Sequence, residues 1–131
     1  MIFPDLTAFY GGLLGILFIL LSVWVTLGRA QYKAHHGDGG QVQLQRRIRI
    51  HANFAEYVPL ALLLIGLNEA SGVESWMVRT MLIALMTARI IHPFGMLAPE
   101  GSLQQYALRA PAMVVTWIVI LIASLLLITS Q

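Results

Sequence analysis

Four apolar runs, each about twenty residues long, dominate this chain and limit what it can fold into. A helix needs about 20 apolar residues to cross about 30 Å of hydrocarbon, and each run meets that requirement. Hydrophobic residues fill 58% of the 131 positions and charged residues only 11%, which is too apolar for a soluble domain of this size. The runs predict one all-α domain over residues 1–131, an integral membrane four-helix bundle with helices at approximately 8–28, 42–68, 74–97 and 103–129.

Basic residues gather in two connections between these runs, and their placement predicts how the chain crosses the membrane. By the positive-inside rule, we expect both connections to face the cytoplasm and both termini to lie on the other side. The first run should stay as a helix, because it lacks the basic start and clear cleavage site of a signal peptide. The basic residues concerned are Arg29, Lys33, Arg46, Arg47, Arg49 and Arg109.

The residues available for metal or thiol chemistry are few. The chain contains no cysteine, so any thiol must come with a substrate. His35 and His36 stand in a segment rich in glycine, which indicates a solvated loop, and no carboxylate–histidine spacing accompanies them. We therefore expect no metal site.

The second run carries a polar stripe at helical spacing. Ionisable side chains are expensive inside a bilayer, so a stripe within a membrane-length run indicates a functional site, with an internal structural ion-pair network as the alternative. Pro59 interrupts the backbone ladder beside it and frees a carbonyl. The residues of the stripe are Arg49, Asn53, Glu56 and Tyr57.

The third run adds Arg89 and His92 in the half that lies toward the basic side. At about 1.5 Å per residue, Glu56 and Arg89 reach comparable depth from that side. An uncompensated charge there would cost several kcal/mol, so we expect the two residues to be near one another or bridged by a ligand. His51 lies about 200° round the helix from Arg49 and should face a different neighbour.

These residues suit a small peptide that carries both charges. Arginine binds carboxylates in bidentate fashion, and a buried carboxylate can accept an ammonium group. Glutathione offers two carboxylates, an amine and a thiol, while the bilayer would hold a lipophilic electrophile. An arginine near the sulfur lowers the pKa of the thiol by stabilising the thiolate, which is the attacking species. A chain this short cannot enclose a large cavity alone, so we expect an oligomer.

The run Arg49-x-His51-x-Asn53-x-x-Glu56-Tyr57-x-Pro59 resembles the signature of the membrane-associated proteins in eicosanoid and glutathione metabolism, the MAPEG family. The resemblance covers essentially the whole chain and extends to Ala88-Arg89-Ile-Ile-His92. The glycine-rich first loop looks most like the short bacterial inner-membrane branch. The sequence departs from the family's synthases at Met96, where they often have tyrosine, and over Pro99 to Gln105.

The resemblance implies a homotrimer in the bacterial inner membrane, with glutathione as co-substrate between adjacent subunits near the cytoplasmic side. It implies that Arg109 stabilises the thiolate, and that Arg29 and His51 reach the site from the neighbouring subunit. The remaining glutathione-binding residues that it implies are Arg49, Asn53, Glu56, Tyr57, Arg89 and His92.

The sequence thus favours a glutathione-dependent transferase or peroxidase acting on a lipophilic electrophile. A non-catalytic protein that binds glutathione or membrane lipid is a second hypothesis. A proton or ion pathway through Glu56, Arg89 and His92 is weaker, because the other half of the membrane supplies only Arg79 and no continuing relay. We expect glutathione, the electrophile, lipid and further copies of the chain as partners, and no nucleic acid.

Overall fold

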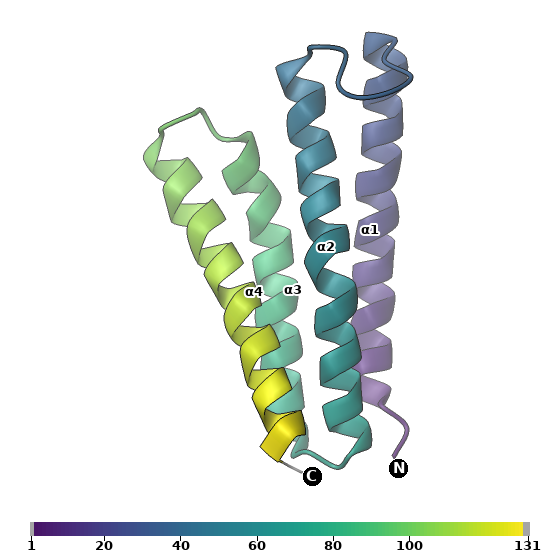
Figure 1. Cartoon of the computed structure of the whole chain (residues 1–131), viewed down its shortest axis with the longest axis vertical. Helices are drawn as coiled ribbons and strands as arrows, with labels where there is room; N and C mark the ends of the chain where they lie inside the picture. The colour runs from purple at the N-terminus through teal and green to yellow at the C-terminus, as the bar shows by residue number, and fades with distance from the viewer. Residues whose placement is uncertain (1, 130–131) are drawn as a thin grey trace.

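A computed structural model describes residues 2–129, which form four helices and no strand (Figure 1). Each helix is long and apolar enough to cross a membrane. The expected all-helical, four-helix membrane architecture is therefore confirmed. The helices are α1 (Asp5–Tyr32), α2 (Val42–Ala70), α3 (Ser75–Leu97) and α4 (Leu103–Thr129).

The helices pack as two neighbouring pairs, α1 with α2 and α3 with α4, and α2 contacts all three other helices. The two loops, residues 33–41 and 98–102, lie at one end, here called the loop end. The α2–α3 turn, the start of α1 and the end of α4 lie at the opposite end, here called the turn end. The two pairs stay together at the turn end and separate toward the loop end (Figure 1). Both chain ends thus share one side of the bundle.

The turn end is fastened by the carboxylate of Glu69, which binds the first turn of α1. Its Oε1 accepts a hydrogen bond from the backbone N–H of Leu6 at 2.8 Å. Its Oε2 accepts from the backbone N–H and the hydroxyl of Thr7, at 2.8 and 2.7 Å. The first N–H groups of a helix have no partner within the helix and carry partial positive charge, so a carboxylate there is stabilising. Glu69 therefore supplies the cap that α1 lacks in its own sequence.

A second tie at the turn end comes from Asn68, which is fully buried on α2. Its side-chain N–H₂ group donates to the carbonyls of Leu64 and Ala123, both at 2.8 Å. The second of these bonds joins α2 to α4 across the bundle. Around these polar contacts the core is apolar; its members include Leu14, Leu21, Ile50, Phe54, Val58, Leu82, Leu85 and Val119.

At the loop end, arginines of α2 hold neighbouring backbone instead of serving only as topology signals. The guanidinium of Arg46 lies 3.4 Å from the carbonyls of Leu97 and Ala98, where α3 ends, and 3.6 Å from Glu100. Arg47 donates to the carbonyl of Trp24 and lies 5.0 Å over its ring. A cation near the C-terminus of a helix is stabilising because the last carbonyls are unpaired.

We expect Glu69→Ala to destabilise the protein by about 1.5–3 kcal/mol, since it removes a charged acceptor from three hydrogen bonds. The matched control is Glu74→Ala, because Glu74 is exposed near the same end and makes no side-chain cap to α3. Thermal unfolding in detergent would measure both variants. Equal melting temperatures for the two variants would show that the hydrogen bonds from Leu6 and Thr7 to Glu69 contribute nothing to stability.

Candidate functional site

The guanidinium of Arg89 stands at the junction of α2, α3 and α4, and its residue is only 2% exposed. It donates to Oδ1 of Asn53 on α2 at 2.7 Å and lies 3.5 Å from the sulfur of Met113 on α4. Its Nε has no hydrogen-bond partner. Over residues 2–129, no carboxylate forms an ion pair with it. Arg89 is thus a buried cation whose charge is solvated by an amide and a thioether alone.

Glu56 takes part in a different pair from the one we expected. Its Oε1 lies 3.7 Å from the guanidinium of Arg49, and both side chains are about half exposed. Seven residues make close to two helical turns, so Arg49 and Glu56 lie along one face of α2. Asn53 contacts Arg89 instead. Within residues 2–129, Glu56 and Arg89 thus form no direct ion pair, and the expectation that they are near one another or bridged by a ligand stays a prediction.

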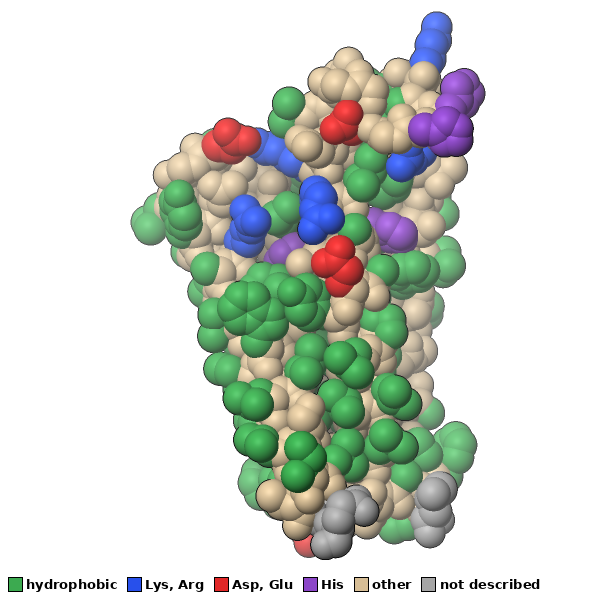
Figure 2. Space-filling view, viewed as in Figure 1, with side chains coloured by type: hydrophobic (Ala, Val, Ile, Leu, Met, Phe, Trp, Pro, Cys, Tyr) green, Lys and Arg blue, Asp and Glu red, His purple; other side chains and the backbone are tan. Residues whose placement is uncertain are grey.

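His92 is buried one turn beyond Arg89 on α3. It lies close enough to Arg89 and Arg109 to interact with the charge of each. Tyr57 also lies within electrostatic range of Arg89. The polar residues of α2 and the two of α3 therefore face one region, which Figure 2 shows as a band of blue, red and purple side chains above a broad apolar surface.

Arg109 lies at the edge of this region, exposed in the second turn of α4. Its cleft has a volume of about 290 Å³ and is lined by Gln105, Tyr106, Ala110 and Met113. Met113 touches both this cleft and Arg89, so it links the two. Nothing in the sequence marked Met113, because a methionine in an apolar helix is indistinguishable from core filler.

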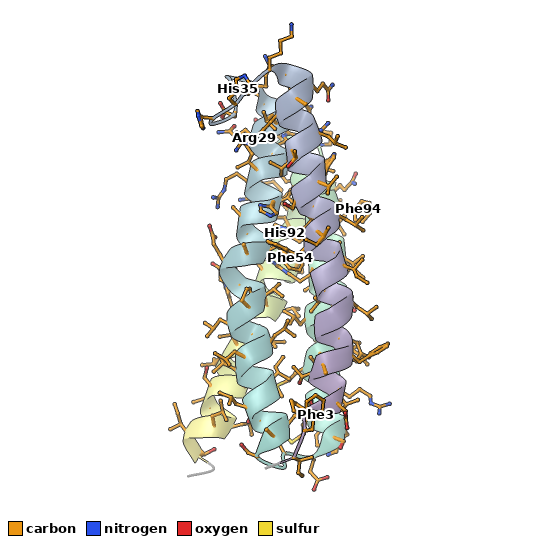
Figure 3. The ribbon with its side chains drawn as sticks, turned by 90° about the vertical axis from the view of Figure 1, so that its right-hand side faces the viewer. Phe3, Arg29, His35, Phe54, His92 and Phe94 are labelled. Carbon is orange, nitrogen blue, oxygen red and sulfur yellow. The ribbon has the colours of Figure 1, made fainter. Side chains whose placement is uncertain are left out.

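Arg29 and His51 lie on the other side of α2, toward α1. The ring of His51 packs against Phe18 with centroids 4.9 Å apart, and its buried Nε2 has no partner. Arg29 donates to the carbonyl of Gly37 in the first loop. Figure 3 shows Arg29 and His35 at the loop end and His92 farther from that end. Because α1 makes no contact with α4, the chain does not bring Arg29 and His51 together with Arg109.

The described residues contain no group of three or more histidine, cysteine, aspartate or glutamate side chains placed to hold a metal ion. What the arrangement offers is cationic: three guanidiniums, from Arg49, Arg89 and Arg109, accompany one carboxylate, that of Glu56. Such a site is complementary to an anion, and most of all to one with more than one carboxylate.

Comparisons with known proteins identify the family of this chain. The MAPEG family profile matches residues 7–129, and the chain belongs to that family. The chain is 40% identical to "Inner membrane protein YecN" of Escherichia coli strain K12 over 89 residues. The aligned segment covers 68% of this chain and 68% of the relative. The protein of the same name from Escherichia coli O6:H1 matches equally well. No solved structure matches. The predicted membership of the MAPEG family is thereby confirmed. The relative from Escherichia coli is an inner membrane protein, as the resemblance to the bacterial branch implied.

We expect Asn53→Ala to destabilise the protein by about 1–3 kcal/mol, because it leaves the buried guanidinium of Arg89 without its oxygen acceptor. Adding Arg89→Met to Asn53→Ala should recover part of that loss, since the double variant removes both partners. Unfolding of the two single variants and the double variant would measure the coupling. Strictly additive losses would mean that the 2.7 Å contact carries no energy of its own.

Proposed function

We propose that this protein is a membrane-embedded, glutathione-dependent transferase or peroxidase. The observation that carries the proposal is the buried guanidinium of Arg89, which has no carboxylate partner in residues 2–129. A buried charge without a counterion is costly, so a ligand carboxylate that reached it would supply what the fold leaves out. Membership of the MAPEG family supports glutathione as the source of that carboxylate.

The half-exposed pair of Arg49 and Glu56 would hold the other end of the peptide. Arg49 can donate hydrogen bonds to the second carboxylate, and Glu56 can accept hydrogen bonds from the α-ammonium group. The ligand would replace the single ion pair between Arg49 and Glu56 with two, one to its carboxylate and one to its ammonium group. Tyr57 and Asn53, which line the same region, would add neutral hydrogen bonds. This set of donors and acceptors fits a small peptide better than it fits a simple inorganic anion.

Arg109 would act on the sulfur. A guanidinium beside a thiol stabilises the thiolate and so raises its share at neutral pH. The thiolate sulfur would form a bond to the electrophilic carbon of a lipophilic substrate, and the leaving group would depart with the bonding electrons. With a hydroperoxide, the sulfur would instead take one oxygen, and a second glutathione would complete reduction to alcohol, water and glutathione disulfide. His92, within electrostatic range of Arg109, would complete the polar wall.

A neighbouring subunit would close the site. Arg49, Glu56 and Arg109 are exposed on the single chain, and exposed charges on the side of a membrane bundle need a cover other than lipid. A homotrimer would provide it, with Arg29 and His51 entering from the adjacent copy. That assignment is consistent with their separation from Arg109 within one chain.

A second candidate is a protein that binds glutathione without turning it over. It is favoured by the freedom of Arg109, whose side chain makes no hydrogen bond or ion pair within residues 2–129. A proton pathway has no such support, because Glu56 is paired with Arg49 on an exposed face of α2. The experiment that follows separates binding from chemistry.

Titration of the purified protein with glutathione should give a saturable thiolate absorbance in the ultraviolet that Arg109→Ala abolishes. Arg49→Ala and Glu56→Ala should instead raise the Kd by about 10- to 100-fold, because each loses a charge-assisted contact. Arg79→Ala is the matched control, since that arginine lies near the turn end. Calorimetric binding without any thiolate signal would favour the non-catalytic candidate. If the wild type shows neither thiolate absorbance nor calorimetric binding, glutathione is rejected as the ligand.

Subunit sharing predicts complementation. At a glutathione concentration near the wild-type Kd, Arg49→Ala and His51→Ala subunits should each show little activity alone, yet a mixture should recover activity, because some sites then draw both intact residues from different copies. Co-expression with two different affinity tags would supply the mixed oligomers, and native mass spectrometry would count their subunits. If mixed oligomers recover no activity, each site takes its Arg49 and its His51 from the same subunit.

A further inference from the structure

Gly95 of α3 lies directly against the backbone of Arg109 on α4. A Cβ atom added to Gly95 would stand 2.5 Å from the backbone nitrogen of Arg109 and 2.9 Å from its Cα. Ordinary van der Waals contact begins at 3.4 Å, so α4 would have to move by about 0.9 Å or more. The atoms in the way are the backbone nitrogen, Cα and Cβ of Arg109, whose positions the backbone fixes, so no side-chain rotation can relieve the collision.

Other helical glycines in this chain do not share that situation. Gly12 and Gly15 of α1 have open space where a Cβ would stand, and the neighbours of Gly28 are side chains of Leu44 and Arg47. Gly66 would meet only the side chain of Thr7, at 3.3 Å. The collision at Gly95 is therefore specific to the place where α4 passes α3 beside the site.

The Arg109 side chain does not itself hold the start of α4 in place, because its guanidinium has no hydrogen bond or ion pair within the described residues and its residue is exposed. The short loop before α4 is tied to α2 through Arg46, which contacts the carbonyl of Ala98 and the carboxylate of Glu100, and its other hydrogen bonds are local. At Gly95 the backbones of α3 and α4 meet with no room for a Cβ atom, so their separation beside Arg109 depends on this contact. Gly95 also continues the buried face of α3 that carries Arg89 and His92.

We propose that Gly95 is a positioning residue, which sets the distance between the Arg109 guanidinium and the Arg89–Met113 contact. The inference rests on the proposed function, in which Arg109 meets the substrate sulfur. A displacement of about 1 Å at a reacting group can lower a rate on the order of 10²-fold, so one methyl group here is sufficient to uncouple binding from thiolate formation.

The test compares Gly95→Ala with Gly12→Ala, which makes the same change in helix propensity where a Cβ meets nothing. At saturating glutathione, Gly95→Ala should reduce thiolate absorbance at neutral pH tenfold or more and move its pH midpoint upward. The Kd for glutathione should change less than threefold, because Arg49, Glu56 and Arg89 are untouched. A fall in affinity that parallels the fall in thiolate would overturn the proposal, since loss of packing lowers both together.

A distance measurement separates failure of this inference from failure of the proposed function. The chain has no cysteine, so spin labels can be placed at Ile90→Cys and Leu103→Cys, both exposed positions, with labelled subunits diluted in unlabelled protein. Gly95→Ala should lengthen the label distance by about 1 Å or more, and Gly12→Ala should not. If wild-type protein gives no thiolate, the proposed function fails while the distance still decides whether Gly95 places α4. An unchanged distance overturns the inference.

A further variant covers the case in which Gly95→Ala does not fold. Inserting one glycine between Glu100 and Gly101 lengthens the exposed loop and leaves the α3–α4 contact intact. If the contact positions Arg109, the insertion should keep at least half of the wild-type thiolate signal. Loss of that signal in a folded, glutathione-binding insertion variant would assign the positioning to the loop and overturn the proposal.

Discussion

The burial of one guanidinium organises this bundle. Arg89 enters the protein interior with an amide oxygen and a sulfur as its contacts and with no carboxylate partner from residues 2–129, an arrangement that hydrocarbon could not tolerate. It survives because α2, α3 and α4 meet around it and exclude lipid. The same arrangement that shields the charge leaves it without a carboxylate partner in residues 2–129, and this imbalance is the reason for proposing that an anionic ligand binds there.

The two ends of the bundle differ in how closely the helices are held together. At the turn end, Glu69 holds the start of α1 and Asn68 holds α4, so the helices are fixed to one another by polar contacts. At the loop end the helix pairs diverge (Figure 1). Arg49, Glu56 and Arg109 are exposed on the single chain. A membrane bundle gains little from apolar packing relative to lipid, so a few polar ties decide where it is closed and where it is open.

The charged surface is only half of a site. Arg49 and Glu56 pair with each other on an exposed face, and Arg109 stands free beside them, so the single chain presents donors and acceptors without enclosing them. His51 packs against Phe18 on the side of α2 that faces α1, and Arg29 belongs to α1 itself. These positions, away from Arg109, are the reason for proposing that a neighbouring copy completes the site.

The sequence alone determined the number of helices, their membrane character and the family, because apolar runs of membrane length leave the backbone no alternative to helix and because the Arg49–Pro59 motif is specific. It also predicted that Glu56 and Arg89 reach comparable depth from the basic side. It could not decide that Arg89 pairs with Asn53, that Glu56 pairs with Arg49, or that Met113 and Gly95 matter. Spacing along one helix fixes which residues share a face, but which face meets which neighbour depends on helix rotation and crossing, and only the tertiary structure settles those.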